Sequence, residues 1–239
     1  MLICRSIRYS GKQVGRYILE RPLGEGRYGL CFLARSDCGE KVVVKKFKTS
    51  LLKKTSPKNI DEAVILSKLE DRRIPELLGV INQKGFYGFV LEYKPGCTVK
   101  NLLFKYGYKF SSEEIFNIGL QLIRVIKYLH ENGVVHRDIR IPNVLLDKGE
   151  VYLIDFGLAR WAEHHRYPYD LDFSYLGDFL LYLLYSTYQK GKKAEFPWYE
   201  ELALNDEQKL FLKRLLRLEE VYESINDIET DFIRVFSQT

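Results

Sequence analysis

The chain has 239 residues, of which 46% are hydrophobic and 29% are charged, and it contains only seven prolines. This composition is that of a globular protein with enough apolar residues for a sizeable core. The formal net charge of +5 is mild. Solvated lysines account for most of such an excess, so charge alone does not indicate a nucleic-acid-binding protein.

The cysteines argue against a zinc site or a disulfide framework. Cys4, Cys31, Cys38 and Cys97 are scattered, without a C-x-x-C pair and without histidine at ligand spacing. Reduced thiols are therefore expected, as in the cytoplasm.

Neither a signal peptide nor a membrane span is expected. The N-terminus MLICRSIRYSGKQ has no apolar stretch long enough for a signal peptide. The most apolar segment, 171–188, is shorter than twenty residues and carries Asp172 and Asp178, which favours a buried core helix. We therefore expect a cytoplasmic protein without a membrane partner.

The first hundred residues predict mainly β-strands. Runs rich in β-branched and aromatic side chains are separated by the turn-forming sequences DCGE and NQKG, and they cover residues 17–36, 41–47, 77–82 and 86–93. A helix is expected at about 59–69, where Ala63, Leu66 and Leu69 can share one face.

Helices dominate after the sequence KPGC. Ser111 and Glu114 have the spacing of a capping box and predict a helix that continues to about residue 131. Two short strands, NVLLD and EVYLI, flank the turn KGE, and everything beyond residue 172 is predicted to be helical, including 205–222. The sequence thus predicts an α+β fold with a β-rich first lobe and a helical second lobe, joined near 93–96.

A glycine-rich run, Gly24-Glu25-Gly26-Arg27-Tyr28-Gly29, lies between two predicted strands. A plain glycine-rich turn explains this run. Alternatively, the hairpin lays backbone N–H groups over a triphosphate, because glycine lets the chain approach a ligand closely.

Lys45 lies on the next strand, and Glu62 lies on the following helix, from which it can reach back toward Lys45. Each residue also has an ordinary interpretation. Lys45 resembles a solvated edge lysine like Lys46, and Asn59 with Glu62 has the spacing of a capping box.

The segment VVHRDIRIPNVLLD is more specific. Asp138 and Asn143 lie five residues apart in a predicted loop, where a carboxylate can accept a hydrogen bond from an attacking hydroxyl and an amide oxygen can bind Mg²⁺. Asp155 follows an apolar strand and precedes Phe156-Gly157. Asn143 and Asp155 together offer the few protein oxygens that Mg²⁺ takes alongside phosphate oxygens and waters.

The order and spacing of these motifs resemble the signature set of the protein-kinase superfamily, over about residues 17–228. The resemblance implies a bilobal fold with an N-terminal extension at 1–16, an N-lobe at 17–93 and a C-lobe at 94–239. The chain is similar to small stand-alone bacterial serine/threonine kinases of the eukaryotic-like type. This likeness implies ATP and Mg²⁺ as cofactors and a protein hydroxyl as the acceptor.

The resemblance also implies a role for each motif residue. Gly24, Gly26 and Gly29 would cover the phosphates, and Lys45, oriented by Glu62, would hold the α- and β-phosphates. Asp138 would position or deprotonate the acceptor hydroxyl, Arg140 would stabilise charge on the transferring phosphoryl group, and Asn143 and Asp155 would bind Mg²⁺. The other nucleotide-binding residues would be Leu23, Cys31, Val43, Glu92 and Tyr93, with Leu91 at the back of the adenine pocket.

Three residues depart from the usual kinase motifs. Cys31 stands where valine is usual and Val43 where alanine is usual, so a slightly reshaped nucleotide pocket is expected. Arg140 replaces the lysine that serine/threonine kinases usually place two residues after the catalytic aspartate. An arginine can still stabilise phosphoryl charge.

The activation segment is predicted to be shortened. Sixteen residues, 156–171, separate Asp155 from Asp172, roughly half the usual number, and no A-P-E sequence follows. The segment between Gly157 and Asp172 contains no serine or threonine, only Tyr167 and Tyr169. We therefore expect activity without serine/threonine phosphorylation there. Asp172 is expected to anchor the catalytic loop, and Arg137 to pair with a fixed acid or stay solvated.

Other functions stay open at this point. The short segment also suits a kinase-fold enzyme that phosphorylates a small molecule, and a pseudokinase acting as a binding module is a further alternative. The basic run KKFKTSLLKKTSPK, 45–58, is a candidate for binding nucleic acid or an acidic partner. No aromatic residue interleaves it beyond Phe47, so no nucleic-acid partner is expected. The sequence makes no prediction of oligomeric state.

Overall fold

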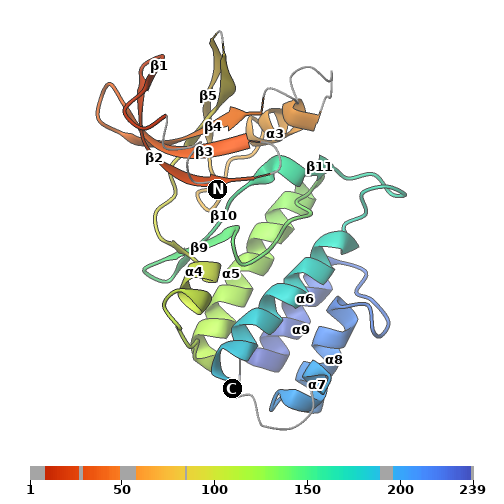
Figure 1. Ribbon diagram of the computed structural model, residues 1–239. Helices are drawn as coiled ribbons and strands as arrows, with labels where there is room; N and C mark the ends of the chain where they lie inside the picture. Colours follow the sequence, from red (N-terminus) through yellow and green to blue (C-terminus); the bar gives the residue numbers. More distant parts are fainter. Residues whose placement is uncertain (1–8, 27–28, 49–57, 84, 189–195, 238–239) are drawn as a thin grey trace. The chain divides into compact units, whose positions relative to one another are not determined.

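The computed structural model describes residues 9–26, 29–48, 58–83, 85–188 and 196–237 (Figure 1). The chain divides into two compact units, Met1–Lys94 and Pro95–Thr239, called here the first and the second unit. Within the described ranges, no helix is long and apolar enough to cross a membrane.

An antiparallel sheet of six strands forms most of the first unit, in the order β1-β2-β3-β4-β6-β5. The strands are β1 (Gln13–Val14), β2 (Tyr17–Glu25), β3 (Gly29–Ser36), β4 (Lys41–Phe47), β5 (Leu77–Gln83) and β6 (Phe86–Glu92). The predicted strands are confirmed. The helix α3 (Lys58–Leu66) ends three residues before the predicted limit, and the Lys68 N–H closes a tighter final turn by donating to the Ile65 carbonyl, three residues back.

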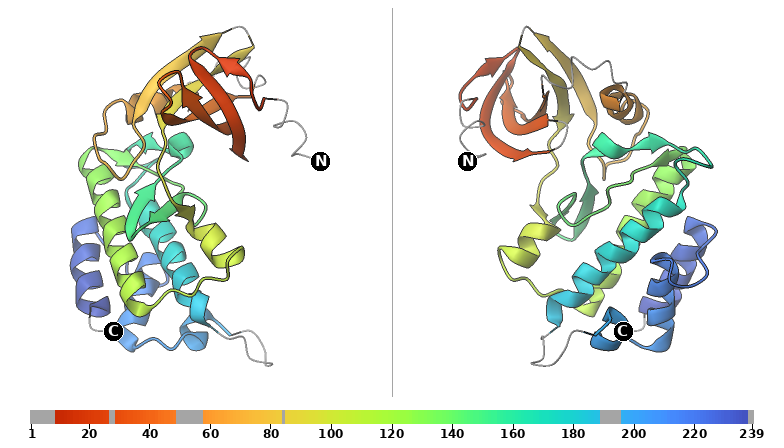
Figure 2. Two further views of the ribbon diagram at one scale, coloured as in Figure 1. Left: turned by 90° about the vertical axis from the view of Figure 1, so that its left-hand side faces the viewer. Right: turned by 45° about the vertical axis from the view of Figure 1, so that its right-hand side comes forward.

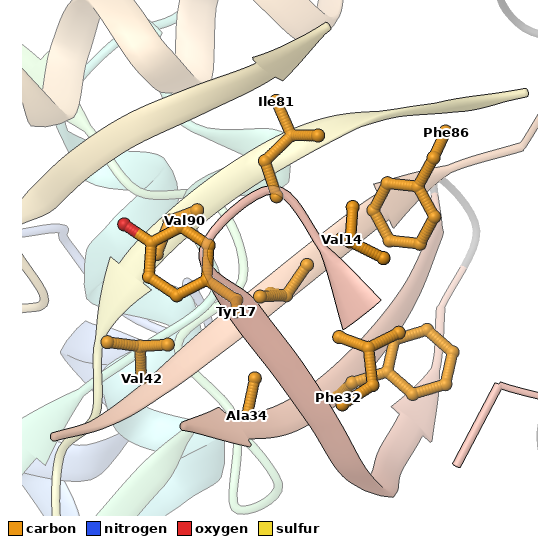
Figure 3. Packing of buried hydrophobic residues seen from close by; sticks show 10 residues of the cluster. Val14, Tyr17, Phe32, Ala34, Val42, Ile81, Phe86 and Val90 are labelled. Atoms are coloured by element: carbon orange, nitrogen blue, oxygen red, sulfur yellow. The ribbon is translucent and has the colours of Figure 1, made fainter. Parts of the chain in front are cut away.

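The two faces of this sheet carry different kinds of side chain. One face encloses a buried apolar cluster that includes Phe32, Val42 and Val90 (Figure 3). In the strand register, Cys31 lies opposite Lys45 and Val43 lies opposite Leu91. Because successive side chains alternate between faces, these residues lie on the face opposite the apolar cluster.

Lys46 corrects a prediction. We expected a solvated edge lysine, but Lys46 is buried, and its ammonium lies 5.5 Å from the ring centroids of both Tyr9 and Phe86. Cation–π attraction to two rings offsets part of the cost of removing the ammonium from water. The following residues 49–57, with most of the basic run at 45–58, lie outside the described residues.

The second unit is mainly helical (Figures 1 and 2). Its α-helices are α4 (Val99–Phe104), α5 (Ser112–Glu131), α6 (Asp170–Leu184), α7 (Trp198–Glu201), α8 (Asp206–Leu215) and α9 (Ile225–Phe236), and its 3-10 helices are η1 (Phe156–Leu158) and η2 (Tyr185–Thr187). Short strands make two small sheets, β10-β9-β7 and β11-β8. They are β7 (Cys97–Thr98), β8 (Val134–Val135), β9 (Val144–Asp147), β10 (Glu150–Leu153) and β11 (Arg160–Trp161).

Helix α5 is the centre of the second unit. The predicted capping box is confirmed, because Ser111 Oγ accepts from the N–H of Glu114 and the Glu114 carboxylate accepts from the N–H of Ser111. The residues predicted to share a face are all buried, namely Ile115, Ile118, Leu122, Ile126 and Leu129. Helix α5 packs against α6 and α9, and α8 packs against the same two helices (Figures 1 and 2).

The prediction that everything beyond residue 172 is helical is wrong between α8 and α9. Helix α8 ends at Leu215 instead of continuing to 222, whereas α6 begins at Asp170, two residues before the predicted start. Arg217 has φ +61°, a left-handed conformation that cannot continue a helix. Residues 189–195 lie outside the described ranges.

Candidate active site

A buried ion pair joins the sheet and the helix of the first unit. The Lys45 ammonium lies 2.7 Å from Glu62 Oε1 and 2.9 Å from Oε2, and the two side chains are only 6% and 2% exposed. Lys45 is therefore not a solvated edge lysine. The capping-box alternative for Asn59 and Glu62 is wrong as well, because α3 begins at Lys58 and Asn59 lies inside the helix.

The glycine run forms the predicted β-hairpin between β2 and β3. The Gly26 N–H donates to the Gly29 carbonyl over 2.9 Å, and residues 27–28 at the tip lie outside the described residues. A Cβ on Gly29 would collide with the Lys46 carbonyl, so the sheet itself requires this glycine. Among the described residues, no atom lies within 4 Å of a Cβ added to Gly24 or Gly26. The described part of the hairpin therefore leaves free space beside these two glycines.

The residues expected to bind the nucleotide are spread along four strands. Leu23 on β2 is exposed, whereas Cys31 on β3 and Val43 on β4 are half-buried on the same face as Lys45. Leu91 on β6 is buried beside Val43.

The end of β6 is held by polar contacts within the first unit. The N–H of Glu92 donates to the Glu76 carbonyl over 2.9 Å. The buried Lys94 ammonium lies 2.7 Å from Glu92 Oε2 and donates to the Arg72 carbonyl over 2.8 Å. Glu92 and Tyr93 are half-buried. This segment therefore has a fixed backbone, although the sequence did not reveal the role of Lys94 in fixing it.

In the second unit, Asp172 anchors the loop that carries Asp138. Its side chain is fully buried, and its two oxygens accept from the backbone N–H groups of Arg137 at 2.7 Å and His136 at 2.8 Å. His130 Nε2 lies 3.1 Å from the same carboxylate. The predicted anchoring role of Asp172 is confirmed. His130 was missed, yet it stands four residues after Ile126 on the buried face of α5, which is a signal for a polar core residue.

His136 orders the loop from inside. Its ring is fully buried, and burial lowers the pKa of His136 against the opposing attraction of Asp172 and Asp138. The Asp138 N–H lies 3.3 Å from His136 Nδ1, and the Phe156 ring packs edge-on at 4.7 Å between centroids. An imidazole enclosed in this way suits a structural role.

Asp138 is held by two side chains of its own loop. Asn143 Nδ2 donates to Asp138 Oδ2 over 2.7 Å and to the Asp138 carbonyl over 2.9 Å. Arg140 Nε lies 2.5 Å from Asp138 Oδ1, and the arginine side chain is 56% exposed. Asn143 therefore uses its amide nitrogen on Asp138 and turns Oδ1, an acceptor, elsewhere.

A backbone hydrogen bond connects this loop to Ile154, which follows β10 and precedes Asp155. The N–H of Ile154 donates to the Asn143 carbonyl over 2.9 Å. Asp155 has φ +64° and caps η1, with Oδ1 accepting from the Gly157 N–H at 3.4 Å. The structure thus brings Asn143 and the residue preceding Asp155 into direct contact.

The 156–171 segment is attached to the strand before the catalytic loop. Strand β11 pairs with β8, and the Ala162 N–H donates to the Gly133 carbonyl over 2.7 Å. Arg137 donates to the Leu158 carbonyl over 3.1 Å, and its guanidinium carbon lies 4.5 Å from the Tyr167 ring centroid. The expectation that Arg137 pairs with an acid or stays solvated is therefore wrong.

Comparison with known proteins identifies the family. The family model of the protein kinase domain matches residues 17–176. The chain belongs to the protein kinase family. The family predicted from the motifs is confirmed, and the curled antiparallel sheet of the first unit and the helices of the second are those of a protein kinase.

This kinase is similar to proteins of bacteria and eukaryotes. The probable serine/threonine-protein kinase YbdM of Bacillus subtilis (strain 168) is 34% identical over 227 residues, which cover 92% of the chain and 89% of that protein. A probable serine/threonine-protein kinase of Dictyostelium discoideum is 34% identical over 151 residues, covering 62% of the chain and 30% of that protein. The human hormonally up-regulated neu tumor-associated kinase is 35% identical over 161 residues, covering 63% and 22%.

Proposed function

We propose that the chain is an ATP- and Mg²⁺-dependent kinase that phosphorylates serine or threonine hydroxyls of proteins. The observation that carries the proposal is the contact of Asn143 with Asp138 in a loop anchored by the buried Asp172. The printed names of the bacterial and amoebal relatives, both serine/threonine-protein kinases, support this acceptor class.

Asp138 is proposed to orient the acceptor hydroxyl. Its carboxylate is fixed by Asn143 on one oxygen and by Arg140 on the other. Each carboxylate oxygen can accept more than one hydrogen bond, so both retain capacity for a substrate O–H. Arg140 is proposed to contact the transferred phosphoryl group, because its exposed guanidinium has further N–H donors beyond the one aimed at Asp138.

Asn143 and Asp155 fit an Mg²⁺ ion. Mg²⁺ takes one or two carboxylates together with substrate phosphates and waters, and it accepts only oxygen ligands. Because Asn143 Nδ2 donates to Asp138, the side-chain oxygen Oδ1 of Asn143 is the atom that can bind Mg²⁺. Bound Mg²⁺ would neutralise negative charge on the phosphate oxygens of ATP.

Lys45 and the glycine hairpin are proposed to bind the phosphates of ATP. Glu62 fixes the Lys45 ammonium at the position where β4 and α3 meet. Gly24 and Gly26 are the proposed points of close approach to the phosphates, because no described atom lies within 4 Å of a Cβ added to either. Leu23, Cys31, Val43, Glu92 and Tyr93 are proposed to contact the rest of the nucleotide.

Phosphoryl transfer from labelled ATP tests the proposal. Wild type, Asp138→Asn and Asp155→Asn are incubated with Mg²⁺ and with casein, myelin basic protein or small alcohols, followed by phosphoamino-acid analysis. Asp147→Asn on β9 is the matched carboxylate control. The proposal is supported if serine or threonine is labelled by wild type and by the Asp147→Asn control, but not by Asp138→Asn or Asp155→Asn. Label on small alcohols alone indicates a small-molecule kinase, and nucleotide binding without transfer indicates a binding module.

A further inference from the structure

Each tyrosine of the 156–171 segment packs on a residue that contacts Asp172. The guanidinium carbon of Arg137 lies 4.5 Å from the Tyr167 ring centroid, and the backbone N–H of Arg137 donates to Asp172 over 2.7 Å. The His130 ring lies 4.6 Å from the Tyr169 ring and 3.1 Å, through Nε2, from the Asp172 carboxylate. The segment therefore contacts the anchor of the catalytic loop at two points.

Arg137 has a backbone conformation that its surroundings must maintain. Its φ is +65°, which residues other than glycine rarely adopt and which persists only when neighbouring contacts hold it. Asp172 holds the backbone end of Arg137, while the Leu158 carbonyl and the Tyr167 ring hold the guanidinium end. Asp138 is the next residue, so the backbone of Arg137 sets the direction of the catalytic carboxylate.

Tyr167 is itself fixed within the segment. Tyr167 and Glu163 exchange backbone hydrogen bonds of 2.7 and 3.2 Å, which closes a tight turn. A second guanidinium, that of Arg166, lies 5.2 Å from the Tyr167 ring centroid. The ring thus offers a π face to two cations, an attraction that needs no negative charge on the segment.

We propose that Tyr167 is a positioning residue that holds Arg137, and through it Asp138, in the working geometry without any modification of the segment. Tyr169 supports the same anchor through His130. The proposal rests on the proposed kinase function. It adds which contacts hold the loop that carries Asp138 in its active conformation. It explains in physical terms why a segment without serine or threonine between Gly157 and Asp172 suffices.

Three tyrosine variants test the proposal on phosphatase-treated protein. Tyr167→Leu removes the π face, Tyr167→Phe keeps it, and Tyr182→Leu is the matched control, because Tyr182 is an exposed tyrosine of α6 that packs on Phe104. We expect Tyr167→Leu to lower kcat about tenfold while KM for ATP changes less than about twofold. Tyr167→Phe and Tyr182→Leu are expected to keep the wild-type kcat.

A double variant separates positioning through Arg137 from general damage. If Tyr167 acts through Arg137, then Arg137→Ala with Tyr167→Leu loses no more activity than Arg137→Ala alone. Fluorescence supplies a readout other than activity. In a Trp198→Phe background, Trp161 on β11 reports on the segment, and iodide should quench it more strongly in Tyr167→Leu than in Tyr167→Phe.

Opposite results overturn the proposal. The proposal is contradicted if Tyr167→Leu keeps the kcat of wild type. It is also contradicted if the wild-type protein loses its activity on phosphatase treatment. Failure of the kinase function looks different, because wild type and Asp138→Asn would then be equally inactive. Even in that case, equal quenching of Trp161 in all variants would show that the contact of Tyr167 with Arg137 does not stabilise the segment.

Discussion

Lys45 and Glu62 form an ion pair in the interior of the first unit, 2.7 Å from Nζ to Oε1. Both charges are withdrawn from water, and their mutual attraction offsets part of the cost of burying them. Removing either side chain takes this close opposite charge away from a buried charged group.

Lys45→Ala is therefore expected to destabilise the first unit by roughly 3–5 kcal/mol, besides weakening ATP binding. The double variant Lys45→Met with Glu62→Leu should be much closer to wild type in stability, because no buried charge remains, although it should still bind ATP poorly. Urea denaturation and nucleotide titration measure the two effects. A double variant as unstable as Lys45→Ala would contradict this account.

The glycines of the hairpin should separate into two classes. Gly29→Ala places a Cβ against the Lys46 carbonyl. The overpacking strain, on the order of 1–3 kcal/mol, is expected to lower Tm by several degrees. Gly26→Ala meets no described atom within 4 Å and should leave Tm unchanged while raising KM for ATP. Thermal denaturation and steady-state kinetics on both variants check the contrast, and equal Tm losses would refute it.

Asp172→Asn is expected to impair both folding and catalysis. The amide has one acceptor oxygen where the carboxylate offers two, so the N–H groups of His136 and Arg137 cannot both keep their bonds. Hydrogen bonds to charged groups contribute about 1.5–3 kcal/mol each, and a loss of about this size in unfolding free energy is expected.

Asp170→Asn is the control for this change. It lies in the same first turn of α6, but its ion pair with Arg217 is partly exposed to solvent, and surface pairs contribute about 0–1 kcal/mol. Activity assays and urea denaturation of both variants make the comparison. Equal losses in the two variants would show that the anchoring contacts of Asp172 are unimportant.

Arg140 should affect turnover more than stability. Its ion pair with Asp138 is largely exposed on the arginine side, so Arg140→Ala should change the unfolding free energy by no more than about 1 kcal/mol. The kcat should fall about tenfold or more, because a donor aimed at developing charge is lost, and Arg140→Lys should recover part of it. Unchanged kcat in Arg140→Ala would remove this residue from the mechanism.

Glu229 should make stability depend on pH on the acid side. Partial burial raises its pKa, but the hydrogen bonds from Arg124 and Lys127 on α5 outweigh burial and lower the pKa of Glu229 below 4.5. A lowered folded pKa gives stability that is present above the unfolded pKa and lost as pH falls through the folded value.

Glu229→Gln should accordingly be less stable than wild type at neutral pH, and the difference should shrink below about pH 4.5. Urea midpoints measured across the acid range check this, with Glu223→Gln as an exposed control. If the stability difference between wild type and Glu229→Gln grew on acidification, the pKa of Glu229 would not be lowered by folding.

Local signals in the sequence predicted the elements that depend on local contacts. Helix α5 was found almost to the residue, because its capping box and its apolar face lie within its own turns. Helix α8 was overestimated, since the left-handed Arg217 that follows it binds Asp170 of α6, far away in sequence. Lys46 was misjudged for the same reason, because the rings around it come from Tyr9 and Phe86.

The candidate site divides in the same way. Asp138, Arg140 and Asn143 contact one another within six residues of chain, and their motif predicted them together. The contact of Arg137 with Tyr167 spans thirty positions, and no spacing rule announces it. Motifs therefore predict which groups carry chemistry, whereas the residues that hold those groups in place emerge only from the folded chain.

The two neighbouring lysines of β4 make faithful strand pairing a condition of function. Lys45 faces the Glu62 carboxylate, and Lys46 faces aromatic rings on the opposite side of the sheet. A slip of β4 by one residue would exchange these surroundings, because side chains alternate between faces. The resulting protein would still contain a sheet and a lysine at each place, yet Glu62 would meet the wrong one. A register error of a single residue would thus leave the secondary structure unchanged and still disrupt the proposed binding of ATP.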